Sequence, residues 1–241
     1  DLTLAKFLAI SGIILPMLPN ENIIPDINLT PYTIWLATVV VSGISYLSYL
    51  LKRYVFRESG VLVSGIIGGL YSSTATISVL ARKSRNTHSQ EASEYVAAML
   101  LAVSMMFLRF MILILIFSST IFTSIYPYLL IMAAVAAGVA WFIHTRRKRT
   151  PDADLVEEED DSSNPLEFKV ALIFAGLFVI FTVLTHYTLI YAGTGGLNLL
   201  SFVSGFSDIT PFILNLLQGT GSVAATVVMA CTMQAIISNI V

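Results

Sequence analysis

The sequence predicts an all-α integral membrane protein with six transmembrane helices and two re-entrant helical hairpins, arranged as an inverted-topology repeat. Of its 241 residues, 56% are hydrophobic and only 12% are charged, whereas soluble domains carry about 25% charged residues. The charges gather in short stretches between long uncharged runs. Two of these runs, 60–84 and 195–218, are interrupted in the middle by glycine and helix-starting residues. Most of the chain therefore needs lipid around it, and two apolar segments are not expected to cross the lipid.

Six apolar runs are expected to span the bilayer. A hydrocarbon core about 30 Å thick requires ~20 apolar residues per helix, and somewhat fewer where the bilayer thins locally. Four runs meet this length, and two shorter ones have aromatic or proline boundaries, Pro127 being suited to a first helical turn. The expected spans are 3–18, 32–54, 95–117, 127–144, 167–192 and 222–240.

The two interrupted segments are each expected to form helix, break, helix. Glycine commonly ends a helix, and Ser, Thr and Asp commonly begin one because their side chains cap the first N–H groups. Each half has about ten residues, which extend ~16 Å and reach only the middle of the bilayer. We therefore expect two hairpins that enter and leave on the same side. The break residues are Gly68, Gly69, Ser72, Ser73 and Thr74 in the first segment, and Gly205, Ser207, Asp208, Thr210 and Pro211 in the second.

The distribution of Lys and Arg favours hairpins over spans, because cytoplasmic loops of membrane proteins carry an excess of basic residues. With two hairpins, twelve basic residues lie on one side and none on the other, and Arg109 lies inside the membrane. If 60–84 crossed once, four basic residues would oppose eight. The hairpin arrangement places both chain ends and the linker 145–166 in the cytoplasm. The twelve residues are Lys6, Lys52, Arg53, Arg57, Arg82, Lys83, Arg85, Arg146, Arg147, Lys148, Arg149 and Lys169.

The linker 145–166 contains a basic block followed by an acidic block with Pro and Ser. Such a composition is too polar to pack against a core. It is interpreted as a topology anchor with a solvated linker, and a contact with anionic lipid or a regulator is the alternative.

An internal repeat follows from aligning Gly69 with Gly205, which also matches Thr74 with Thr210, Ile77 with Ile213 and Leu80 with Leu216. Each repeat would contain three spans and one hairpin, over 1–125 and 126–241. Because three is odd, the second repeat enters from the opposite face, so that the first hairpin enters from the cytoplasm and the second from outside. Inverted repeats whose broken helices meet at the midplane are a common plan of secondary transporters.

A solute site is expected where the two tips meet. Arg109 and Asp208 would both lie near mid-membrane, where a retained charge usually has a function. They are expected to form an ion pair that substrate breaks, or a split site for an anion and a cation. The alternatives are a pair that only fixes helix packing, and an ordinary helix cap at Asp208. The candidate substrate-binding residues are Ser72, Ser73, Thr74, Thr76, Arg109, Asp208, Thr210 and Asn239, with Asp208 the metal ligand if a cation is bound.

Other classes of function find little support. Cys231 lies in an apolar run and is expected to be a buried hydrophobe, and no metal-ligand spacing appears. The Gly-rich stretches lack the strand and Lys of phosphate-binding loops. No nucleophile pairs with a base, so we expect no enzyme, no cofactor and no nucleic-acid partner, although a coupling ion of unknown identity is compatible with transport. Asn215 and Gln234 are weaker site candidates, because amides also join helices, and His186 is a minor candidate for proton relay.

Several segments together are similar to a known domain. They are 18–49, the segment 65–85 with its GGLYSSTA sequence, Arg109 after Met105 and Met106, and SGFSDITPF at 204–212. The chain resembles, over nearly its whole length, the C-terminal conserved domain of unknown function of bacterial MgtC/SapB-type membrane proteins. Ser238 and Asn239 resemble the Ser/Ala-Asn pair of its last helix. A second acidic residue is common after the Asp that matches Asp208, but Ile209 and Thr210 stand here, which argues against a carboxylate cage around a cation.

The resemblance implies a bacterial inner-membrane protein loosely linked with magnesium or other ion handling. It also implies an N-terminal MgtC/SapB domain in the full-length chain, and we expect this sequence to be cut from a longer one. A homodimer is a further expectation. Two functions are weighed: a transporter or channel for a small ion or polar solute, and a non-transporting regulatory or scaffolding membrane protein that acts through its cytoplasmic loop.

Overall fold

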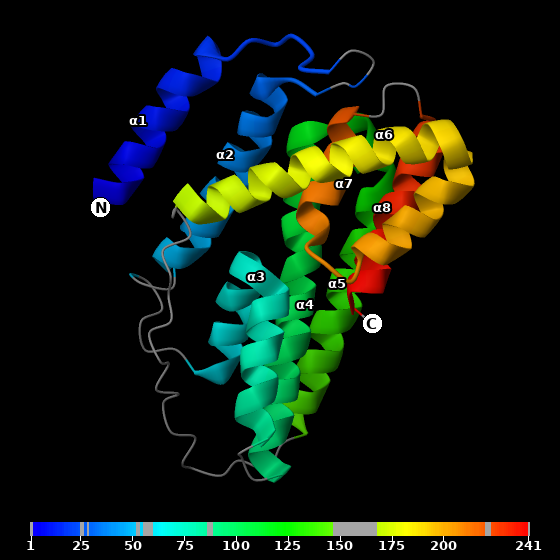
Figure 1. Cartoon of the computed structure of the whole chain (residues 1–241). Helices are drawn as coiled ribbons and strands as arrows, with labels where there is room; N and C mark the ends of the chain where they lie inside the picture. Colours follow the sequence, from blue (N-terminus) through cyan, green and yellow to red (C-terminus); the bar gives the residue numbers. More distant parts are fainter. Residues whose placement is uncertain are drawn as a thin grey trace. The chain divides into compact units, whose positions relative to one another are not determined.

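The structure, a computed structural model, describes residues 2–24, 27, 29–51, 54, 60–85, 89–146, 168–219 and 223–240. Within these residues it consists of eight α-helices and contains no strand (Figure 1). The predicted all-α class is therefore confirmed. The helices are α1 (Leu2–Met17), α2 (Pro31–Leu50), α3 (Val61–Arg85), α4 (Ser89–Phe117), α5 (Ser119–Thr145), α6 (Phe168–Ser204), α7 (Ile209–Gly219) and α8 (Ala225–Ile240).

Five of the described helices are long and apolar enough to cross a membrane. They are α2, α3, Ala92–Phe117 of α4, α5, and Ala171–Ser204 of α6. The predicted spans 3–18 and 222–240 correspond to α1 and α8, each of 16 residues, which extend ~24 Å and fall short of a full hydrocarbon core. The chain is a multi-pass helical membrane protein, and the number of six spans stays a prediction.

One predicted boundary is wrong. The span expected at 127–144 begins at Ser119, so Pro127 lies inside α5 rather than in its first turn. Ser118 starts the helix: its carbonyl accepts from the N–H of Phe122 at 2.9 Å and its Oγ accepts from the N–H of Ile121 at 3.4 Å. Pro127 removes one backbone hydrogen bond, and membrane helices tolerate such a proline when neighbouring groups replace the bond.

The chain divides into two compact units, which are described separately. Unit 1 comprises Asp1–Ser42, Leu113–Ile125 and Leu166–Val241, and unit 2 comprises Gly43–Ile112 and Tyr126–Pro165. The first interrupted segment lies in unit 2 together with most of α4. The second lies in unit 1 together with α8.

In unit 2, α3 is two half-helices joined at Ser72, whose backbone is extended (φ −157°, ψ 104°). Val61 and Leu80 belong to one apolar cluster with Ala98 of α4, although a straight helix would hold them ~28 Å apart. The side chain of Thr76 lies directly against Gly68. The segment therefore doubles back on itself, and α3 is drawn as two adjacent pieces in Figure 1.

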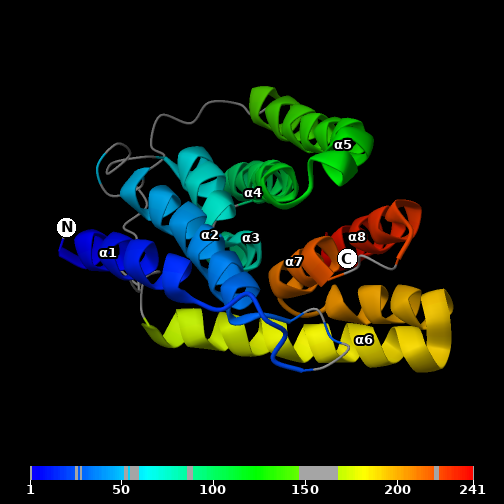
Figure 2. The same ribbon diagram turned by 90° about the horizontal axis from the view of Figure 1, so that it is seen from above.

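In unit 1, α6 is broken at Gly193, whose φ of +59° and ψ of −153° suit only glycine. The short part 194–204 follows, then a turn, then α7. The ring of Phe212 in α7 packs edge-on against Phe181 in the first part of α6, with centroids 5.5 Å apart. Figure 2 shows α7 and α8 beside α6. Eight consecutive residues of α7, 209–216, are buried, so this short helix forms the core of unit 1.

Candidate functional site

The tip of the first hairpin is a capped helix start. The N–H of Ala75 donates to Ser72 Oγ at 3.4 Å, and the extended backbone of Ser72 is typical of an N-cap residue. Of the other predicted hydroxyl residues, Ser73 is buried, Thr74 is exposed and Thr76 is half-buried. Capping therefore uses one hydroxyl at this tip.

Arg109 reaches the same tip from α4. Its Nη1 donates to the carbonyl of Tyr71 at 2.9 Å, and Tyr71 is the last residue before the break. The last carbonyl groups of a helix lack intrahelical partners and carry partial negative charge. The guanidinium satisfies one of them, and it also brings a positive charge to the start of the second half-helix.

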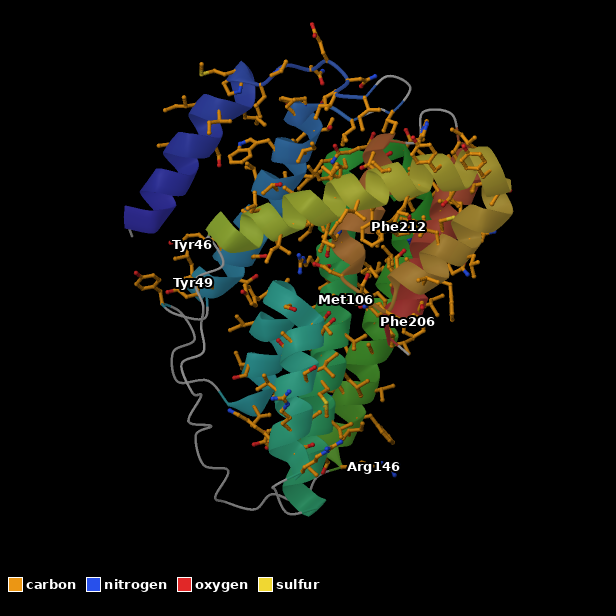
Figure 3. The ribbon with its side chains drawn as sticks, viewed as in Figure 1. Tyr46, Tyr49, Met106, Arg146, Phe206 and Phe212 are labelled. Carbon is orange, nitrogen blue, oxygen red and sulfur yellow. The ribbon has the colours of Figure 1, made fainter. Side chains whose placement is uncertain are left out.

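The tip of the second hairpin carries Asp208. Its Oδ1 accepts from the N–H of Thr210 at 3.0 Å, so Asp208 is the N-cap of α7, while its side chain is exposed. Ser207 Oγ donates to the carbonyl of Ser204 at 3.0 Å. This tip therefore presents a carboxylate, where the first tip presents a guanidinium. Phe206, labelled in Figure 3, marks the same turn.

Two adjacent residues of α8 hold the second tip. Asn239 Nδ2 donates to the carbonyl of Gly205 at 2.8 Å and to that of Ser207 at 3.4 Å. Ser238 Oγ donates to the carbonyl of Phe202 at 2.8 Å. These bonds satisfy carbonyl groups left free where the helix 194–204 ends. Asn239 thus contacts the tip, and its role in substrate binding stays a prediction.

The two tips are held in equivalent ways. Gly69 lies against Ala102 of α4, and Gly205 lies against Ser238 of α8, with the same number of residues separating each pair. Tyr71 and Ser207, whose carbonyl groups accept from Arg109 and Asn239, each lie two residues after the aligned glycine. The same arrangement of hairpin and following helix occurs once in each unit.

The structure groups the predicted residues by unit. Unit 2 brings Arg109 to the tip that contains Ser72, and unit 1 brings Asn239 to the tip that contains Asp208. Arg109 and Asp208 belong to different units, so their interaction stays a prediction. Among the described residues, no three or more His, Cys, Asp or Glu side chains are grouped as a metal site would require.

A buried amide ties α7 to α6. Asn215 is 2% exposed, and its Nδ2 donates to Thr185 Oγ1 at 2.8 Å and to the carbonyl of Phe181 at 3.2 Å. The sequence could indicate that the amide of Asn215 forms a hydrogen bond between helices. It could not indicate the partner, because Thr185 lies in a different helix. Cys231 is buried as expected, and its Sγ contacts Asn198 Oδ1 at 3.3 Å.

Comparison with known proteins gives a family without a known activity. Residues 39–241 match the family described as a domain of unknown function, DUF4010. No curated protein matches the chain. No solved structure matches it either. Since the match covers most of the sequence, including both hairpin segments, the chain belongs to the DUF4010 family.

Proposed function

We propose that this chain is a membrane transport protein, a secondary transporter or channel, for a small ion or polar solute. Its site would lie near the middle of the bilayer, between the tips of two re-entrant hairpins. The observation that carries the proposal is the pair of polar helix breaks, at Ser72 and at 205–208, each held by a side chain of the following helix.

Depth in the membrane is the first supporting argument. The half-helices 61–71 and 73–85 extend ~16–20 Å each, so a hairpin of this length ends near the midplane. Non-helical backbone at that depth is tolerated only where it is buried in protein or lines a water-filled cavity. The equivalent contacts of Gly69 and Gly205 support an inverted repeat of six spans and two hairpins, in which the two tips converge from opposite faces.

Charge is the second supporting argument. At the first tip, the Arg109 guanidinium and the N–H groups that begin the second half-helix favour an anionic group. At the second tip, the exposed carboxylate of Asp208 favours a cation. The tips would thus form a split site, or an ion pair that a charged substrate separates. Because Ile209 and Thr210 follow Asp208 where a second acidic residue is common, a single carboxylate would bind the cation at this tip.

The resemblance to MgtC/SapB-type proteins extends the proposal. It favours the bacterial inner membrane, a preceding MgtC/SapB domain in the full-length protein, and a role in handling magnesium or another ion. The distribution of Lys and Arg favours cytoplasmic ends for this segment. A homodimer is compatible with this arrangement. Mg²⁺ is therefore the first ion to test.

The topology can be tested by cysteine labelling. In a background with Cys231 replaced by Ser, single cysteines are introduced at Ser84 and Thr220. If both segments are hairpins, a membrane-impermeant maleimide added to intact cells labels Thr220→Cys and leaves Ser84→Cys unlabelled until the membrane is opened. Labelling of Ser84→Cys from outside would contradict the hairpin at 60–84, because that segment would then cross the bilayer.

The site can be tested by ligand-dependent stabilisation. Purified protein is heated in detergent with MgCl₂, sodium phosphate or choline chloride at equal ionic strength. We expect one of the first two salts to raise the unfolding temperature above the choline control, and Arg109→Ala and Asp208→Asn each to abolish that rise. Unchanged stabilisation in both variants would remove the tips from the site. Deletion of 150–164 should leave the stabilisation by the salt intact. If the deletion abolishes the activity of the protein in cells while Arg109→Ala and Asp208→Asn retain it, the regulatory alternative is favoured.

A further inference from the structure

Three exposed arginines lie at the ends of two helices in unit 2. Arg82 and Arg85 occupy the last turn of α3. Arg146 follows α5 directly, and its N–H donates to the carbonyl of Phe142 at 3.2 Å. Arginine is favourable at these positions because the free carbonyl groups of a helix C-terminus carry partial negative charge.

Packing against α4 places both helix ends at the level of the first turns of α4. Leu80, just before Arg82, contacts Ala98 of α4 in the cluster that also includes Tyr95. Ser104 Oγ of α4 donates to the carbonyl of Ala133 in α5 at 2.9 Å. Because α5 runs antiparallel to α4, Arg146 comes level with the first turns of α4. Figure 3 shows Arg146 at the same end of unit 2 as the start of α4.

The outer face of α5 leads directly to this end. Ile131, Val135 and Val139 repeat at helical spacing and are exposed, as acyl-chain-facing residues of a membrane helix are. Trp141 follows with 70% of its surface exposed, which is typical of the boundary between acyl chains and headgroups. The Arg146 guanidinium then lies 4.3 Å from the centre of the Phe142 ring. In a bilayer, the arginine would therefore lie at the level of the lipid phosphates.

We propose that Arg82, Arg85 and Arg146 form a binding surface for the headgroups of anionic phospholipids. Guanidinium groups bind phosphate oxygens in pairs and retain their charge at any physiological pH. Each basic residue near an anionic leaflet strengthens such binding about fivefold. The surface is continuous with the lipid-facing side of α5, so one lipid can place its acyl chains along Val135 and Val139 and its phosphate against Arg146. This inference does not depend on transport.

Trp141 provides a local reporter for this surface. The chain contains two tryptophans, so Trp35→Phe leaves Trp141 as the only one. The protein is reconstituted in phosphatidylcholine vesicles that contain equal fractions of phosphatidylglycerol, with bromine placed on the acyl chains of one lipid or of the other. We expect brominated phosphatidylglycerol to quench Trp141 at least twofold more than brominated phosphatidylcholine. In 1 M NaCl, where the Debye length falls to about 3 Å, the two should quench equally.

Matched variants assign the preference to these arginines. Arg82→Gln/Arg85→Gln/Arg146→Gln should abolish the preference for phosphatidylglycerol and keep quenching by phosphatidylcholine, which shows that Trp141 still faces lipid. Lys6→Gln/Lys52→Gln/Lys169→Gln removes the same charge from other segments and should retain the preference. The proposal is overturned if both lipids quench Trp141 equally in the parent protein. It is also overturned if the preference for phosphatidylglycerol survives in the arginine variant or at high salt, and these residues then have only a topological role.

Discussion

Replacing Gly69 with alanine is expected to lower the free energy of unfolding by about 2 kcal/mol. A Cβ at this position would lie 2.6 Å from the Cα of Ala102 and 2.7 Å from its carbonyl oxygen. Both atoms belong to the backbone of α4, so no side-chain rotation can relieve the overlap, and overpacking of this kind costs about 1–3 kcal/mol. Gly65 lies equally close to the backbone of Ala98, so the two helices must separate along the whole first half of the hairpin.

Gly138→Ala is the matched control. Gly138 is also in a helix of unit 2, but a Cβ there would meet nothing within 4 Å, so only the helix propensity changes, by up to about 1 kcal/mol in favour of alanine. Both variants are compared by unfolding with sodium dodecyl sulfate in mixed micelles. Gly205→Ala should also destabilise the protein, because a Cβ at Gly205 would overlap with Ser238 of α8, as a Cβ at Gly69 would overlap with Ala102 of α4. If Gly69→Ala proved as harmless as Gly138→Ala, the close contact between α3 and α4 would be wrong.

The breaks in the helices could be predicted because they are encoded locally. Ser72 and Asp208 cap helices with their own side chains, and Gly193 adopts a backbone conformation open to few other residues. Residue type alone indicates such positions. The same local reasoning located both interrupted segments to within a few residues.

The partners of the tips could not be predicted, because they depend on tertiary packing. The interaction of Arg109 with Asp208 stays a prediction. The structure shows that Arg109 Nη1 donates to the carbonyl of Tyr71, a main-chain group without any signature in the sequence. The start of α5 was missed for a related reason. Pro127 was expected in a first helical turn, whereas the helix begins at Ser119, and Thr123 and Ser124 donate to the carbonyl of Thr120 within it. Polar side chains that bond to their own helix fit into a membrane span.

Replacing Asn215 with leucine is expected to destabilise unit 1 by about 2 kcal/mol. The amide is buried and donates both to Thr185 Oγ1 and to the carbonyl of Phe181, and leaving buried acceptors without a donor costs about 1–3 kcal/mol. Asn198→Leu is the control, since Asn198 is exposed and its Oδ1 accepts from the weak thiol donor of Cys231. It should change the free energy of unfolding by less than about 0.5 kcal/mol.

A double-mutant cycle with Thr185→Val separates this hydrogen bond from the loss of packing. Hydrogen bonds between membrane helices show coupling energies of about 0.6 kcal/mol on average and up to about 1.7, and the short 2.8 Å contact favours the upper part of that range. Unfolding of the four proteins in mixed micelles gives the coupling, and a value near zero would contradict the contact. The side chain of Asn215 joins α7 to α6 by hydrogen bonds, and Asp208 caps the start of α7. A weakened Asn215 contact should therefore also loosen the position of the Asp208 carboxylate, which links the stability of unit 1 to the geometry of its tip.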